Sequence, residues 1–252
     1  MRRTSGIAWW RWVIALGALG GWSALMLAVG RRAAGPLAAL AGALFTVPLA
    51  SLGEWLVHGI FYHRSLPGLG LLRRIHHHGH HFALFPPRRY VKAEGHEFMR
   101  VRSPLTPFRM ADNPWDNALT KWSQVSLHFV AGIPLILWPA WMGTARAVFA
   151  GAALATLAGI SWLLAHVHGA IHTPRGRWIE GRAWFRWLDR HHYIHHVDLS
   201  ANINFMLPLC DFLLGTRKAA LSEIEALTWP SYEQARALPG PERRHLSGPS
   251  AG

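Results

Sequence analysis

The sequence predicts an all-α integral membrane protein with about four transmembrane helices. Three observations predict this fold class: long apolar blocks, tryptophans near their ends, and an uneven distribution of positive charge between them. The chain of 252 residues is 51% hydrophobic, yet it has 14 Trp, 17 His and a formal net charge of +13. Lys and Arg residues placed between apolar blocks indicate contact with anionic lipid. The sequence shows no soluble basic motif, so we expect no nucleic acid partner.

Four stretches have about the 20 apolar residues that are needed to cross a bilayer. They cover approximately residues 7–29, 36–57, 125–142 and 147–165. Six tryptophans lie near the ends of these stretches, as in the aromatic belts of membrane proteins. They are Trp9, Trp10, Trp55, Trp122, Trp138 and Trp141.

The first stretch has an alternative interpretation as a cleaved signal peptide. Two arginines follow Met1, and the small-x-small segment 28–30 could serve as a cleavage site. The apolar run is longer than the core of a signal peptide, which favours a membrane span. Cleavage would leave the orientation of the later spans unchanged.

The positive charges predict the orientation of the spans. With four spans, the N-terminal region, residues 58–124 and residues 166–252 share one side, and they hold 23 of the 26 Lys and Arg residues. The opposite loops hold only Arg31, Arg32 and Arg146. The positive-inside rule therefore predicts a multi-pass protein with both termini and both large loops in the cytoplasm.

Histidines are grouped in four boxes on this predicted cytoplasmic side. The boxes cover residues 58–63, 76–81, 166–172 and 191–196. On an α-helix, positions i, i+3 and i+4 lie within an arc of roughly 100°, so three imidazoles at this spacing can bind one metal ion. His58 and His63 are five residues apart, about 140° around an α-helix, so we expect a bend near Gly59 or ligation of two different metals.

These spacings select ten candidate metal ligands. They are His58, His63, His77, His80, His81, His168, His172, His192, His195 and His196. Ten ligands exceed the four to six that one ion binds, which predicts two metal ions. In the crowded boxes, the α-helical register predicts that His76 and His191 are dispensable. Cys210 is the only cysteine, so iron–sulfur clusters and thiolate zinc sites are excluded within one chain.

In chain order the boxes read H-x4-H, H-x2-HH, H-x3-H and H-x2-HH, which resembles the fatty acid hydroxylase/sterol desaturase superfamily. Residues 204–216, NFMLPLCDFLLGT, resemble the segment that follows the last box in that family. The third box is most similar to the fatty acid 2-hydroxylase branch. The resemblance covers about residues 50–217, within one membrane domain over residues 1–237. We expect residues 238–252, rich in Pro, Gly, Arg and Ser, to be a disordered tail.

The resemblance implies four transmembrane helices with a cytosolic helical cap that carries the di-metal histidine site. It also implies a lipid hydroxylase of lipid metabolism, with two iron ions as cofactor, O2 as co-substrate and no catalytic residues beyond the metal ligands. The sequence has no fused haem domain, so we expect a separate electron-transfer protein as partner. Zinc binds such sites more tightly than ferrous iron, so isolated protein can contain zinc.

Four polar residues beside the last box are candidates to orient an imidazole through a hydrogen bond. They are Asp189, Asp198, Asn202 and Asn204. For the two aspartates, the alternative is a solvated helix surface.

Two other functions remain as alternatives. A desaturase or a carotenoid-type hydroxylase would use the same metal pair. A membrane metal transporter or metal store would place its ligands and acidic partners near the middle of the bilayer. Here the boxes follow the predicted spans and no carboxylate lies deep within a span, which favours an enzyme.

Overall fold

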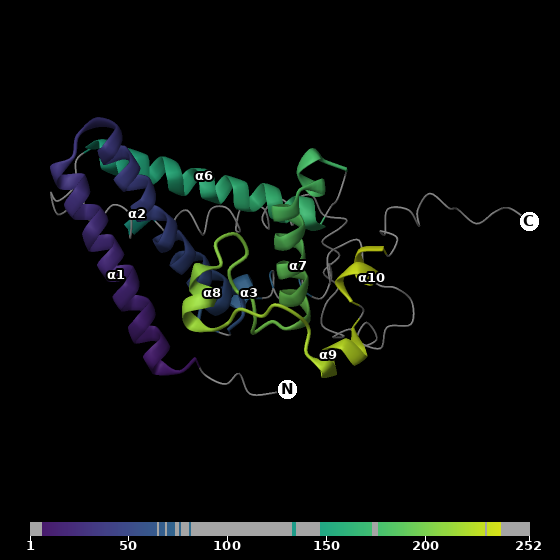
Figure 1. The fold of residues 1–252 in the computed structure, drawn as a ribbon. Helices are drawn as coiled ribbons and strands as arrows, with labels where there is room; N and C mark the ends of the chain where they lie inside the picture. The colour runs from purple at the N-terminus through teal and green to yellow at the C-terminus, as the bar shows by residue number, and fades with distance from the viewer. Residues whose placement is uncertain are drawn as a thin grey trace, which may run out of the picture. The chain divides into compact units, whose positions relative to one another are not determined.

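The structure is a computed structural model that describes residues 7–64, 66–68, 70–73, 76, 81, 133–134, 147–172, 176–229 and 231–237. All regular secondary structure in these residues is helical (Figure 1). The chain divides into two compact units. Unit 1 comprises Met1–Ile60, Lys121–His166 and Ser200–Arg217. Unit 2 comprises Phe61–Thr120, Val167–Leu199 and Lys218–Gly252.

Three of the described helices are long and apolar enough to cross a membrane. They are α1 (Trp9–Arg32), α2 (Gly35–Leu56) with its continuation η1 (Val57–Tyr62), and α6 (Ala147–His172). They coincide with the first, second and fourth predicted spans. The predicted span over 125–142 lies outside the described residues, apart from 133–134, which are helical. The predicted tail, residues 238–252, also lies outside them.

Two of these helices extend further than the sequence predicted. The candidate membrane helices end at Tyr62 and Ile171, not near residues 57 and 165. His58 and His168 therefore lie within helices that continue past the predicted ends of the second and fourth spans. The physical reason is that the polarity of a side chain does not interrupt the backbone hydrogen bonds of a helix.

A short turn separates α1 from α2. Ala33 and Ala34 have extended backbones, and Gly35 has a φ of +55°, a conformation that glycine adopts readily. Pro36 follows in the first turn of α2, where its missing N–H costs no hydrogen bond. The two helices therefore pack against each other as neighbours.

Small residues allow the helices of unit 1 to pack closely around Phe149 of α6. A Cβ atom at Gly42 would lie 2.2 Å from the Phe149 carbonyl oxygen, and one at Gly30 would lie 2.3 Å from its ring. Phe149 also contacts Phe45, with ring centroids 5.3 Å apart. Small residues at such contacts are typical of helix packing in membranes.

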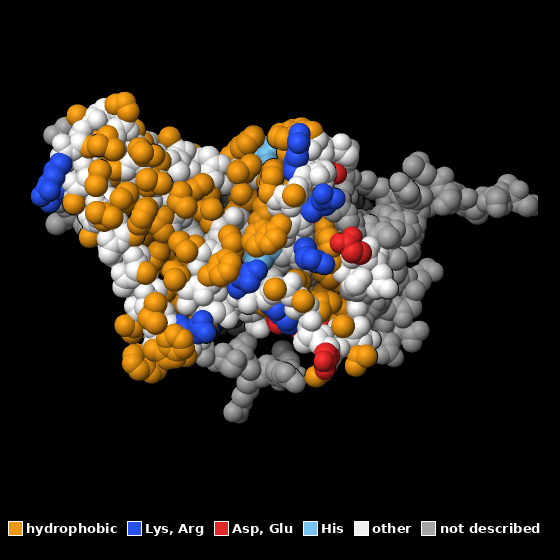
Figure 2. All heavy atoms as spheres, in the orientation of Figure 1, with side chains coloured by type: hydrophobic (Ala, Val, Ile, Leu, Met, Phe, Trp, Pro, Cys, Tyr) orange, Lys and Arg blue, Asp and Glu red, His pale blue; other side chains and the backbone are white. Residues whose placement is uncertain are grey.

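The outer faces of α1 and α2 are strongly apolar. Figure 2 shows hydrophobic side chains over these helices. Large apolar side chains are exposed along their length, including Val13, Ile14, Leu25, Leu37 and Leu40. A contiguous exposed apolar surface of this kind marks contact with lipid or with another protein, and with helices of this length it indicates membrane association.

The other end of unit 1 is closed by α8 (Leu209–Leu214), which packs against α1 and α2. The hydrophobic core at this end of unit 1 contains Ala15, Leu19, Trp55, Ile203, Cys210 and Leu214. Residues 200–217 are thus held against the ends of α1 and α2 that lie farthest from their connecting turn.

In unit 2, the end of α6 is followed by η4 (Trp178–Gly181) and α7 (Ala183–Val197). Three short helices complete the described part: α3 (Gly70–Arg73), α9 (Glu223–Thr228) and α10 (Tyr232–Ala237). Helix α7 buries all four histidines of the last box. Tyr193 and Ile194 of α7 pack with Tyr232 of α10 in a small core.

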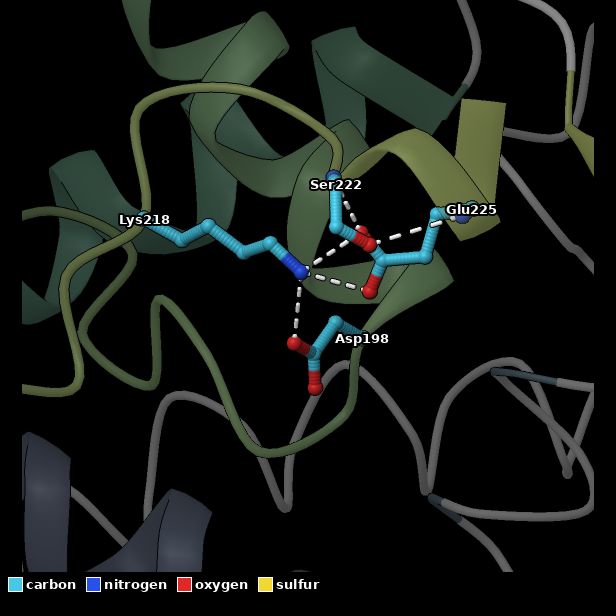
Figure 3. Close-up of polar contacts among 4 residues, drawn as sticks. All are labelled: Asp198, Lys218, Ser222 and Glu225. Carbon is cyan, nitrogen blue, oxygen red and sulfur yellow. Dashed lines mark hydrogen bonds and ion pairs between the residues drawn. The ribbon is translucent and has the colours of Figure 1, made fainter. Parts of the chain in front are cut away.

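Helix α9 is fixed by a charged cluster near the end of α7 (Figure 3). Ser222 and Glu225 form a capping box, in which each side chain accepts a hydrogen bond from the other's backbone N–H. The Lys218 ammonium lies 2.5 Å from Glu225 Oε1 and 2.8 Å from Asp198 Oδ2. Lys218 therefore links the residue that follows α7 to the first turn of α9.

Candidate metal centre

Four histidines of unit 2 form a cluster that fits a metal ion. His63, His76, His81 and His195 each have a ring nitrogen, and these nitrogens lie within 4.8 Å of one another. His63 is half-buried and the other three are buried. We call this group the histidine cluster. Imidazoles brought together at such distances and shielded from water are typical of a metal site.

Two pairs of rings in unit 2 are especially close. The Nε2 atoms of His76 and His81 are 3.0 Å apart, and so are the Nε2 atoms of His192 and His196. Two nitrogens that each lie about 2.1 Å from one metal ion, at a right angle, are about 3.0 Å apart. Both pairs have the separation of neighbouring ligands on one ion, which is also the length of an N–H···N hydrogen bond between two neutral imidazoles.

The two pairs lie next to each other, and His168 of the third box lies beside them. The ring centroids of His81 and His196 are 4.5 Å apart, which joins the second box to the fourth. Those of His168, near the end of α6, and His192 are 4.7 Å apart. Unit 2 thus brings together histidines from all four sequence boxes, with His63 representing the first.

The surroundings of His81 favour a neutral imidazole. Burial lowers its pKa well below the usual value, and the neighbouring rings of His196, His76, His195 and His63 lower it further. A neutral ring keeps a lone pair on one nitrogen, which a metal ligand requires. His81 is therefore prepared to bind a metal without a competing proton.

π-Helical backbone explains how residues five apart share a site. Helix α2 ends at Leu56 and continues as the π-helix η1, and His76 and His81 are also π-helical. In a π-helix the hydrogen bonds join i to i+5, so residues at this spacing lie about one turn apart. Near Gly59 the helix thus continues with a changed hydrogen-bond pattern, in place of the bend that the spacing of His58 and His63 predicted. The π-helical backbone also places His76 in the cluster, whereas the α-helical register predicted that His76 is dispensable.

In unit 1, a backbone carbonyl fixes the orientation of His58. The Nδ1 atom of His58 lies 2.6 Å from the carbonyl oxygen of Ile203. A carbonyl only accepts, so Nδ1 carries the proton and Nε2 keeps the lone pair. Such a bond to a carbonyl is the usual way in which a metal-binding histidine is held in one tautomer.

Buried carboxylates hold the segment that supplies this carbonyl. Asp211 accepts hydrogen bonds from the backbone N–H groups of Ile203 and Asn204, both at 2.9 Å. Glu54 of α2 accepts from the N–H groups of the next three residues, 205–207, at 2.5 to 3.3 Å. Both carboxylates are buried. Glu54 is not among the residues predicted to shape the site, although a carboxylate near the exit of an apolar span is a visible signal in the sequence.

The four residues predicted to orient imidazoles each contact a group other than an imidazole. Asn204 donates from Nδ2 to the Ser51 carbonyl at 2.7 Å. Asp189 is fully buried and accepts from the Tyr232 hydroxyl at 2.8 Å, so a solvated surface is excluded for it. Asp198 is partly exposed and pairs with Lys218. Asn202 has a φ of +52°, and its backbone N–H donates to the Thr216 carbonyl.

The remaining box residues have different positions. His77 and His80 lie outside the described residues, and His172 ends α6. His191 is buried and stacks on Trp187, with ring centroids 5.0 Å apart. His166 is exposed, and its Nδ1 lies 3.0 Å from the Trp162 carbonyl oxygen.

Comparisons with protein-family models, with curated proteins and with solved structures give no match. A buried histidine cluster that fits a metal, in a chain with helices apolar enough to span a membrane, is what the structure shows.

Proposed function

We propose that this protein is a membrane-bound di-iron oxygenase that hydroxylates a C–H bond of a lipid. The observation that carries the proposal is the buried histidine cluster of unit 2, with its two ring pairs at 3.0 Å. The apolar helices support a substrate that reaches the protein through the membrane.

The donor set suits the proposed cofactor. Imidazole nitrogens bind iron, zinc and copper, and an all-histidine set leaves positions at which a small molecule can bind. When bound, a pair of iron ions would supply the oxidising power that side-chain acids and bases lack. The overall reaction would consume the lipid, O2, two electrons and two protons, and would yield an alcohol and water. The electrons would come from a separate electron-transfer protein.

The protein's own contribution is to hold and shield the site. Burial excludes water from His81, His192 and His195, and it keeps the imidazole of His81 neutral. The Ile203 carbonyl fixes the tautomer of His58, which enters the proposed ligand set through its place in the first box. To the ten sequence-predicted ligands we add His76 in this proposal, because its ring is part of the cluster.

The test of the reaction is product analysis in a host supplied with candidate lipids and with ¹⁸O2. We expect an alcohol that contains one ¹⁸O atom, and we expect His195→Ala to abolish it. His166→Ala is a matched control, because this exposed histidine lies on α6 outside the cluster. An alkene product would indicate the desaturase alternative. Bound metal without any oxidised lipid would instead favour the metal store or transporter.

The proposal also predicts two metal ions per chain. Elemental analysis of detergent-purified protein after iron loading is the measurement, with His192→Ala as a comparison. A ratio that stays at one metal per chain under saturating iron would contradict the di-iron assignment.

A further inference from the structure

The segment from η4 to the middle of α7 presents arginines and tryptophans on its surface. We call this surface the Arg–Trp face, and it consists of Trp178, Arg182, Trp184, Arg186, Trp187 and Arg190. All six side chains are exposed, with exposed fractions of 73%, 45% and 41% for the three tryptophans in chain order. The described part of unit 2 therefore leaves a large aromatic surface uncovered.

Helical periodicity divides α7 into two sides. Its exposed residues are Ala183, Trp184, Arg186, Trp187 and Arg190, at the i, i+3, i+4 and i+7 spacing of one helix face. Phe185, Leu188 and the four histidines of α7 are buried. Figure 2 shows Lys and Arg side chains among hydrophobic ones in the region of α7. The exposed side of α7 thus combines cationic and aromatic side chains.

On the exposed side of α7 the charge has one sign, whereas in η4 the partly buried Glu180 pairs with Arg177. Arg186 and Arg190 are the charged residues on the exposed side of α7, because its only acidic residue, Asp189, is fully buried. The Arg182 guanidinium lies 5.3 Å from the centre of the Trp178 ring, which keeps cation and indole side by side. Such a face attracts an anionic partner that also accepts aromatic rings.

The chain itself keeps this face close to the membrane. The candidate membrane helix α6 ends at Ile171, and the face begins at Trp178, in the same unit. Seven residues of extended chain span at most about 25 Å, which is less than the thickness of a bilayer with its headgroups.

We propose that the Arg–Trp face lies on the membrane surface and binds anionic phospholipid headgroups. The guanidinium groups would pair with phosphates, and the indoles would lie at the level of the headgroups, where tryptophan is enriched in membrane proteins. This inference does not depend on the proposed enzymatic function, because it uses only the exposed surface of η4 and α7 and the end of the candidate membrane helix α6.

A fluorescent label tests the proposal in the full-length protein. Cys210 is the only cysteine and is buried, and burial raises the pKa of its thiol to about 11. Introduced cysteines therefore react preferentially. Ala183→Cys places the label within the face without removing its arginines or tryptophans. Ala226→Cys, at an exposed position of α9 among acidic residues, is the matched control.

Both labelled proteins would be placed in nanodiscs of phosphatidylcholine with or without phosphatidylserine. A nitroxide on the lipid headgroup should quench the label at position 183, and aqueous iodide should quench the label at position 226. The additional change Arg186→Glu should lower headgroup quenching at position 183 about fivefold in the anionic discs. Arg32→Glu, which alters an arginine outside the face, should not lower it.

Two results would overturn the proposal. One is a label at position 183 that iodide quenches as strongly as the label at position 226 in both lipids, which would leave an acidic protein as the partner for this face. The other is equal headgroup quenching at both positions, which would show that membrane contact is not specific to the Arg–Trp face.

Discussion

His191 and His192 are neighbours in α7, but their rings have different surroundings. His192 is almost completely buried, with Nε2 at 3.0 Å from that of His196 and its ring next to His168. His191 stacks on Trp187, which is partly exposed at the Arg–Trp face. Two consecutive residues of α7 thus have different positions: the ring of His192 lies among the candidate ligands, and the ring of His191 packs towards the surface.

Replacing these two histidines should have different effects. His192→Ala should abolish product formation and reduce metal content, because the rings that remain cannot restore the same pair geometry. His191→Ala should retain most of both. The comparison uses product analysis and elemental analysis on equal amounts of folded protein, since metal loss can also destabilise the fold. An inactive His191 variant beside an active His192 variant would show that the register is wrong.

At the scale of elements, the π-helix η1 determines the direction in which the first box points. A π-helical turn usually arises where one extra residue is accommodated in an α-helix, and such turns are common at functional sites. Between Leu56 and Tyr62 the chain adopts this conformation without leaving the helix. The backbone hydrogen-bond pattern is therefore as important for the site as the identity of the histidines.

Inserting one alanine between Ile60 and Phe61 should rotate His63 by about 100° relative to α2. We expect the insertion variant to fold and to reach the membrane but to lose metal. Ile60→Ala removes most of the side chain and keeps the register, so it should retain metal. Metal content per folded protein is the measurement. Equal metal content in the insertion variant and the wild type would contradict the role of the register that η1 sets.

A second element, α9, depends on the charge cluster around Lys218. Burial opposes the charge on Glu225, but hydrogen bonds from Lys218 and Ser222 outweigh it, so the pKa of this carboxyl is below its usual range. Burial likewise opposes the charge on Lys218, and its bonds to Asp198 and Glu225 raise the pKa of the ammonium. The cluster is partly exposed, so its contribution to stability is modest.

Glu225→Gln should lower the free energy of unfolding by about 1 kcal/mol at neutral pH. A carboxyl with a lowered pKa stabilises the fold above its unfolded pKa, near 4.3, and this stabilisation is lost as pH falls through the folded value. The difference between wild type and variant should therefore disappear in acid. Thermal unfolding in detergent from pH 7 to pH 3 measures it. Glu223→Gln, in the same turn, is the control and should change stability less.

The sequence predicted some elements well because their causes are local. The spans at α1, α2 and α6 follow from runs of apolar residues, which need no knowledge of tertiary contacts. The inclusion of His76 depends on π-helical backbone, which has no simple sequence pattern. The roles of Glu54 and Asn204 depend on partners about 150 residues away. The boxes therefore indicated the site, whereas the way in which it is held required the structure.

At the scale of the whole molecule, the number of spans decides which compartment contains the C-terminus. The structure describes three helices that are long enough to span a membrane, and the sequence predicts a fourth over residues 125–142. With four spans the C-terminus lies opposite the α1–α2 turn. With three it lies on the same side as this turn.

Reporter fusions at Arg32 and at the C-terminus distinguish these topologies. We expect opposite sides, with the C-terminus in the cytoplasm, because most Lys and Arg residues lie on the predicted cytoplasmic side. Paired alkaline phosphatase and fluorescent protein fusions report the two compartments. Reporters on the same side would indicate three spans and would separate the first two boxes from the last two by the bilayer.

The contacts of Glu54 also have a consequence for biosynthesis. This carboxylate enters the membrane early, as part of the second helix to be made, but its N–H donors at residues 205–207 are synthesised about 150 residues later. A nascent or truncated chain that ends before Asn204 must keep an acidic group in an apolar helix without these donors. Glu54 gains these donors only when the C-terminal segment is complete. We therefore expect membrane quality control to degrade fragments that end earlier and to spare the complete protein.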